Sequence, residues 1–184
     1  MTIALTIEHR LRSFDGSSTE PLAEVAREFG QQESYLAALI ECVTNRSRDV
    51  QAGAAWLIKH HVDAGHIPTP DLTETLAASA LAFCSWEAQL SVLQIVDRLP
   101  LTDVAANDLS ALAAACMHAR RAVLRAWAFD ALLALAKFDE RFADAAALAA
   151  KSAQEDEAAS VRARARLRGA VPRAPYRPDI QPRA

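Results

Sequence analysis

The chain has 184 residues, enough to fill one hydrophobic core or one short array of repeats, so we expect a single domain. Hydrophobic residues make up 52% of it and charged residues 23%, the formal net charge is −3, and alanine, the best helix former, is the most frequent residue. We expect neither a membrane span nor a secretory signal, because no apolar stretch reaches roughly 18 residues and the first 14 residues lack a cationic start followed by an apolar run.

The first 30 residues predict a pair of short helices. Residues 2–14 fit both the alternation of a strand and one face of a helix, and of the two we expect the helix. A second helix follows, because Thr19 can cap its start, Pro21 suits its first turn and Gly30 can end it. We expect residues 1–30 to form an atypical pair that caps one end of a repeat array.

Four further helix pairs are predicted along residues 31–170. Turn and capping signals place them at about 33–65, 71–100, 102–138 and 139–170. Asp71 or Thr73, Ser85, and Thr102 or Asn107 are the expected caps of three of these helices. Residues 171–184 contain four prolines and few apolar residues, so we expect an extended or disordered tail rich in proline and arginine.

One column pattern recurs through these pairs. Val50, Ala88, Leu124 and Val161 are anchors that lie 38, 36 and 37 residues apart. The residues four and eight positions after each anchor are apolar apart from the last, and they are Ala54, Val92, Ala128, Ala165, Ile58, Val96, Leu132 and Gly169. The residues eight and twelve positions before are Cys42, Ala80, Cys116, Ala153, Ala38, Leu76, Leu112 and Ala149. A repeat of this length that holds two helices is typical of a stacked helical solenoid.

The second helices carry a family resemblance. Residues 124–132, with the sequence Leu-Arg-Ala-Trp-Ala-Phe-Asp-Ala-Leu, resemble the second helix of a HEAT repeat, which has an aliphatic-Arg start, small residues and an aliphatic pair. Residues 161–165 are similar, residues 49–57 match with Gln in place of Arg, and the pair around Ala88 departs furthest. The resemblance covers roughly residues 33–170. It implies an all-α, right-handed solenoid of about five HEAT-like helical hairpins with no sheet, a fold used chiefly as a binding scaffold.

Helical geometry also predicts a binding strip. Positions six and nine after each anchor face away from the core, and in a HEAT-like stack the second helices line the concave face. The predicted concave strip, including Trp127 at its flank, consists of Trp56, Lys59, Gln94, Asp97, Trp127 and Asp130. Exposed tryptophan is a favoured contact residue, although the two tryptophans could instead fill space between repeats. Ala52, two positions after its anchor, is expected to face solvent.

These patterns favour a non-catalytic scaffold. We expect it to bind an unidentified protein or peptide through the concave strip, with no cofactor. An enzyme is not favoured, because the sequence has no Gly-rich phosphate loop, no Ser-His-Asp spacing and no HExxH motif.

Charge is distributed unevenly along the chain. From residue 158 onward there are seven arginines against one aspartate, a balance of +6, and the remaining 13 basic and 22 acidic residues give −9. The acidic body disfavours nucleic-acid binding over the whole surface, while the basic end allows a local contact with an anionic partner. The candidate residues for that contact are Arg162, Arg164, Arg166 and Arg168.

The alternative hypothesis is a nucleic-acid-binding protein. Some HEAT-like proteins resemble DNA alkylation-repair glycosylases, which use Trp and Asp on a basic concave surface. Trp127 and Asp130, three residues apart, could imitate that pairing together with the Arg-rich end.

Cysteine and histidine give weaker signals. Cys42, Cys84 and Cys116 lack CxxC spacing, so we expect small core residues in a reduced, cytoplasmic protein. His60, His61, Asp63 and His66 form a cluster with metal-ligand chemistry, but the helical spacing turns His61 about 100° away from His60. We interpret the cluster as a polar helix end and expect no metal site.

Overall fold

The computed structural model describes residues 2–14, 16, 18–45 and 47–169, and this part of the chain is all-α. No strand occurs in these residues, so the predicted fold class is confirmed at this level. The helices are α1 (Ile3–Leu11), α2 (Glu20–Phe29), α3 (Tyr35–Val43), α4 (Arg48–Asp63), α5 (Pro70–Ala80), α6 (Trp86–Leu93), α7 (Asp103–Cys116), α8 (Ala122–Phe138), α9 (Ala143–Gln154) and α10 (Ala159–Gly169), with short 3-10 helices η1 (Val96–Arg98) and η2 (Glu140–Phe142). The tail predicted at residues 171–184 lies outside the described residues.

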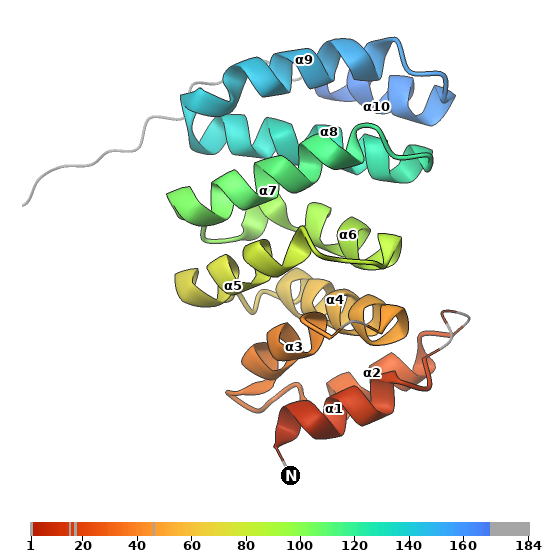
Figure 1. Ribbon diagram of the computed structural model, residues 1–184, viewed down its shortest axis with the longest axis vertical. Helices are drawn as coiled ribbons and strands as arrows, with labels where there is room; N and C mark the ends of the chain where they lie inside the picture. The colour runs from red at the N-terminus through yellow and green to blue at the C-terminus, as the bar shows by residue number, and fades with distance from the viewer. Residues whose placement is uncertain (1, 15, 17, 46, 170–184) are drawn as a thin grey trace, which may run out of the picture.

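The helices follow one another along a stack in two layers (Figure 1). Among the first helices of each pair, α3 contacts α1 and α5, and α5 contacts α7. Among the second helices, α4 contacts α2 and α6, and α8 contacts α6 and α10. Each second helix therefore lies against the second helices of its neighbouring pairs, which allows side chains from successive pairs to meet on one face.

Helix starts agree in part with the capping signals. The hydroxyl groups of Ser85 and Thr102 accept hydrogen bonds from the N–H groups of Ala88 and Ala105, both at 3.2 Å. Thr69, rather than Asp71 or Thr73, caps α5, because Pro70 occupies the first helical position, where its missing N–H costs nothing. Residues 3–11 form α1, so the prediction of a helix at the N-terminus is confirmed.

The repeat columns form the core. The four anchors and the apolar residues of the other columns are all at most 4% exposed, and only Gly169 at the end of the pattern is exposed. Ala54 and Ala128 are fully buried, as expected of positions where helices pass closely. The side chains of Leu11 and Leu22 pack against Gly53, where an added Cβ would lie 2.8 Å from Leu11 Cδ2 and 3.2 Å from Leu22 Cδ2. The N-terminal pair thus packs directly on α4.

Two sequence expectations about burial are wrong. Ala52 is only 8% exposed, because α4 is packed against α1, α2, α3 and α6 and leaves little of its surface free. Cys84 is exposed, since it lies in the turn after α5 instead of inside a helix. Cys42 and Cys116 are buried as expected, and burial raises the pKa of Cys42 to about 12 and that of Cys116 to about 11.

Candidate functional site

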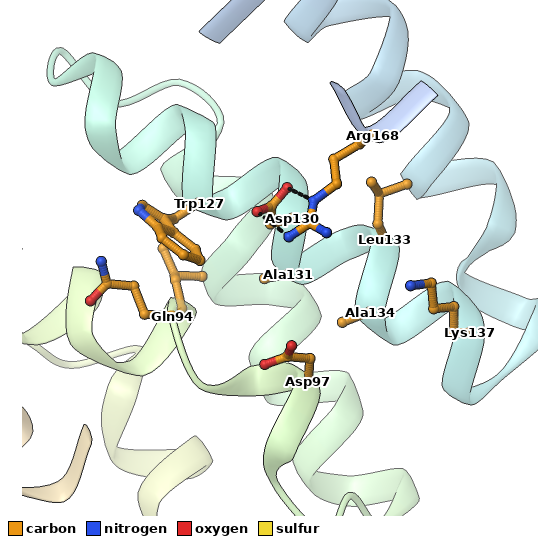
Figure 2. Close-up of a pocket in the computed structure, with 10 residues that line it drawn as sticks. Gln94, Asp97, Trp127, Asp130, Ala131, Leu133, Ala134, Lys137 and Arg168 are labelled. Carbon is orange, nitrogen blue, oxygen red and sulfur yellow. Dashed lines mark hydrogen bonds and ion pairs between the residues drawn. The ribbon is translucent and has the colours of Figure 1, made fainter. Parts of the chain in front are cut away.

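Four residues of the predicted concave strip come together in one hollow. Gln94, Asp97, Trp127 and Asp130 line it at the junction of α6, η1, α8 and α10 (Figure 2). Leu93, Ala131, Leu133 and Ala134 provide apolar surface, and Lys137 and Arg168 add two cationic groups. The hollow holds about 420 Å³ of space, part of it open to solvent.

Asp130 is not free to meet a partner. Its side chain is only 6% exposed, and its carboxylate accepts hydrogen bonds from Arg168 Nε at 3.1 Å and Nη2 at 3.0 Å. Arg164 Nη1 lies 3.3 Å from the same carboxylate. The hydrogen bonds with Asp130 raise the pKa of Arg168 above its usual range. The expectation of an outward-facing Asp130 is therefore wrong, because the long side chains of α10 reach back to cover it.

Trp127 is held by the same helix. The guanidinium of Arg164 lies 3.9 Å from the centre of the indole ring, a cation–π contact, and the indole is partly buried. Two arginines of the next pair, Arg164 and Arg168, lie one turn apart on α10 and between them contact Trp127 and Asp130. Trp127 is partly buried against the core, which is in line with the space-filling role considered for the tryptophans.

Trp56 and Lys59 lie outside the hollow. Trp56 is partly buried against the core and stacks on His60 with ring centres 5.1 Å apart. Lys59 Nζ lies 2.5 Å from the carboxylate of Asp63, which also pairs with Arg98. Burial tends to raise the pKa of Asp63, but the hydrogen bonds from Lys59 and Arg98 outweigh it and lower that pKa. The strip is thus divided into a paired segment on α4 and a hollow farther along the stack.

The hollow leaves three polar groups uncommitted or nearly so. Within the described part of the chain, the side-chain amide of Gln94 and the ammonium of Lys137 make no hydrogen bond or ion pair. The side chain of Asp97 is 67% exposed, and its one ion-pair contact there is Arg98 Nε at 3.5 Å. Sequence reasoning missed Lys137, although it lies 13 residues after Leu124 and therefore on the same helix face as positions six and nine.

Hydrogen bonds that join successive pairs were also missed; they come from a row of polar side chains, of which Gln51 and Arg125 are buried. The residue one position after each anchor donates to a backbone carbonyl near the end of the first helix of its own pair, and we call each such residue a rung. The first and third rungs also form hydrogen bonds with the next pair, and the second is contacted by Cys116 Sγ of the next pair at 3.9 Å. Gln51, 3% exposed, donates to the Val43 carbonyl at 3.3 Å, and its Oε1 accepts from the N–H groups of Cys84 at 3.0 Å and Ser85 at 3.3 Å. The four rungs are Gln51, Gln89, Arg125 and Arg162.

The third rung is ionic. Arg125 donates from Nε and Nη2 to the two carboxylate oxygens of Asp156, at 2.7 and 2.8 Å, and both side chains are only 10% exposed. The hydrogen bonds between them hold the pKa of Asp156 below its usual range and raise that of Arg125. The HEAT-like resemblance noted an Arg column here, but the sequence did not indicate its carboxylate partner 31 residues away.

The histidine cluster is an aromatic stack. The rings of His61 and His66 lie 4.2 Å apart and nearly parallel, and the edge of Tyr35 contacts His61 with centres 5.1 Å apart. Burial, with His66 and His60 nearby, lowers the pKa of His61. No three potential metal ligands gather anywhere in the described residues.

Comparison with protein-family models, curated proteins and solved structures finds no match to this chain. The HEAT-like resemblance consequently stays a prediction. Of the helices described by the structure, none has both the length and the apolarity required to cross a membrane.

Proposed function

We propose that this chain is a HEAT-like α-solenoid that binds a protein or peptide through the hollow on its second-helix face. The observation that carries the proposal is a set of three polar groups around that hollow: the amide of Gln94 and the ammonium of Lys137, which have no partner among the described residues, and the exposed carboxylate of Asp97, which has one contact at 3.5 Å. An amide, a carboxylate and an ammonium around an apolar floor can recognise the N–H, C=O and charged groups of an extended segment.

The rigid back of the hollow supports the same function. Asp130 is fixed by Arg164 and Arg168, and Trp127 by Arg164, so this wall needs no ordering when a partner binds. Preorganised groups lower the entropic cost of association. The neighbouring uncommitted side chains would then supply the specific contacts.

The nucleic-acid alternative has less support from this geometry. Its two named residues, Trp127 and Asp130, are engaged by arginines of α10, and those arginines are therefore partly neutralised before any phosphate could meet them. Binding of a fluorescent DNA duplex at 20 and 200 mM salt tests this alternative directly. Salt-sensitive binding at the lower concentration would support it over the scaffold.

The test of the proposal is a matched pair of triple variants. One replaces Gln94, Asp97 and Lys137 by alanine; the control replaces Asn107, Asp108 and Lys151, which carry the same three functional groups on the first helices α7 and α9. Each protein is used to capture partners from extract of its source cells, and the captured proteins are quantified by mass spectrometry.

We expect a partner that is retained by the wild type and the control variant and lost from the hollow variant. Titration of that purified partner should then show at least about a tenfold loss of affinity for the hollow variant, the effect of losing one or two charge-assisted contacts. Identical capture by all three proteins would contradict the assignment of the hollow.

A further inference from the structure

The last two rungs, Arg125 and Arg162, form equivalent hydrogen bonds with the turns of their own pairs. Arg125 Nη1 donates to the carbonyl oxygens five and six residues earlier, those of Arg120 at 3.2 Å and Ala119 at 2.8 Å. Arg162 Nη1 donates to the equivalent carbonyls, those of Glu157 at 2.8 Å and Asp156 at 2.6 Å. Equal attachment at the same repeat position orients the two guanidinium groups alike with respect to their own pairs.

The two guanidinium groups differ on the opposite edge. In Arg125 the Nε and Nη2 edge holds the carboxylate of Asp156 from the following pair. In Arg162 the same edge makes no hydrogen bond or ion pair with any described residue. Its planar pair of donors has the geometry that binds a carboxylate through both oxygens.

We propose that Arg162 is a carboxylate-binding site for an acidic loop of a partner protein, which docks on the end of the stack formed by α9 and α10. The chemistry follows from the preceding rung, where an aspartate in the turn between two helices fills this position. Arg166, exposed one turn later on α10, adds positive charge beside it. The site is separate from the hollow, and it divides the four predicted anion-contact arginines, since Arg164 and Arg168 are engaged by Asp130.

Charge complementarity favours a different protein, and not this chain or a second copy of it, as the source of the carboxylate that binds Arg162. Residues 170–184 contain three arginines and one aspartate, a balance of +2 that matches the sign of the site. Docking the same end of a second copy would bring like charges together. Among the acids of α1 and α2 at the opposite end of the stack, Glu8 pairs with Arg12, Glu28 with Arg10 and Glu20 with Arg27, which leaves Glu24 as the one acid of these two helices without an ion pair. A carboxylate from a partner meets none of these obstacles.

The test is a titration of the full chain, with the Arg162 Nε–H resonance followed by NMR at pH 6. The probe is a blocked pentapeptide with the sequence of residues 154–158, Gln-Glu-Asp-Glu-Ala, and the control probe has its three acids changed to the corresponding amides. We expect the acidic probe alone to shift the resonance. The affinity is measured in a second titration, in which the acidic probe carries a fluorescent label. Arg162→Gln should weaken its binding about tenfold. Arg162→Lys keeps the charge but loses the paired donors, so it should also weaken binding.

Arg48→Gln is the control, because it removes the same positive charge from an exposed position on α4 that lies outside both the hollow and the α9–α10 end of the stack. It should change probe binding less than about twofold. An unmoved Arg162 resonance, or equal binding by the wild type and Arg162→Gln, would overturn the site. A shift of the free protein's Arg162 resonance in Asp179→Asn would assign the site to the chain's own tail, and a dimer lost in Arg162→Gln would assign it to a second copy; either would overturn the proposed partner.

Discussion

The first and third rungs place different chemistry at the same point of the repeat. Gln51 joins its neighbouring pair through a neutral amide that accepts from backbone N–H groups, whereas Arg125 joins its neighbour through a two-bond ion pair with Asp156. Both residues are at most 8% exposed. The comparison shows that the repeat fixes where a polar link between pairs is made, and that the next turn decides whether its partner is backbone or carboxylate.

The largest effect is expected from Arg125→Ala. It leaves the carboxylate of Asp156, 10% exposed, without its guanidinium partner and also frees the carbonyls of Ala119 and Arg120. Breaking a buried ion pair on one side should lower the free energy of unfolding by about 3 kcal/mol. Urea unfolding followed by circular dichroism measures this value. A loss below that of an exposed control, Arg120→Ala, would show that the ionic rung does not hold the last two pairs together.

Gln51→Ala should have a smaller effect of the same kind. It removes the acceptor for the N–H groups of Cys84 and Ser85, but no charge is left buried. We expect a loss of about 1–2 kcal/mol in the same unfolding experiment, with Gln154→Ala as an exposed control. A loss as large as that of Arg125→Ala would mean that the neutral and ionic rungs contribute equally.

Much of this architecture could be predicted from the sequence, because apolar periodicity reports burial directly. The spacing of Val50, Ala88, Leu124 and Val161 identified positions that are all buried in the structure. The contacts that long side chains make with residues of a neighbouring pair could not be predicted in the same way. Asp130 lies on the outward face by helical geometry, yet it is covered by Arg168, 38 residues away, whose long side chain crosses from the next pair.

The apolar pattern also failed to predict that α4 is covered by neighbouring helices on several sides. Ala52 points away from the anchor Val50, but neighbours on several sides of α4 cover it. The link from Arg125 to Asp156 depends in the same way on where the following turn lies in space, and neither residue type alone indicates it. Periodicity identifies the face toward the core, whereas contacts between pairs require the packed geometry.

The contributions of the ionic rung at Arg125 and the neutral rung at Gln51 to the unfolding free energy should depend differently on pH. The guanidinium of Arg125 holds the pKa of Asp156 below its usual range, so the ionic rung stabilises the fold fully above the unfolded value near 4 and loses its contribution as pH falls through the lowered folded value. The difference in unfolding free energy between the wild type and Asp156→Asn should therefore shrink from pH 7 to pH 3. The corresponding difference for Gln51→Ala should stay constant over this range, because no carboxyl group or histidine takes part in its hydrogen bonds with Val43, Cys84 and Ser85.

The smallest effect is expected where charges pair at the surface. Lys59 and Asp63 form an ion pair on α4, as Arg125 and Asp156 do at the ionic rung. The side chains of Lys59 and Asp63 are, however, 28% and 34% exposed. Water and salt screen such a pair, and Arg98 remains beside Asp63 when the lysine is removed. Lys59→Ala should therefore change the unfolding free energy by less than about 0.5 kcal/mol, and added 0.5 M salt should reduce that change further. A loss comparable to that of Arg125→Ala would show that burial does not set the strength of these ion pairs, and that the charges on α4 hold the stack as firmly as the ionic rung.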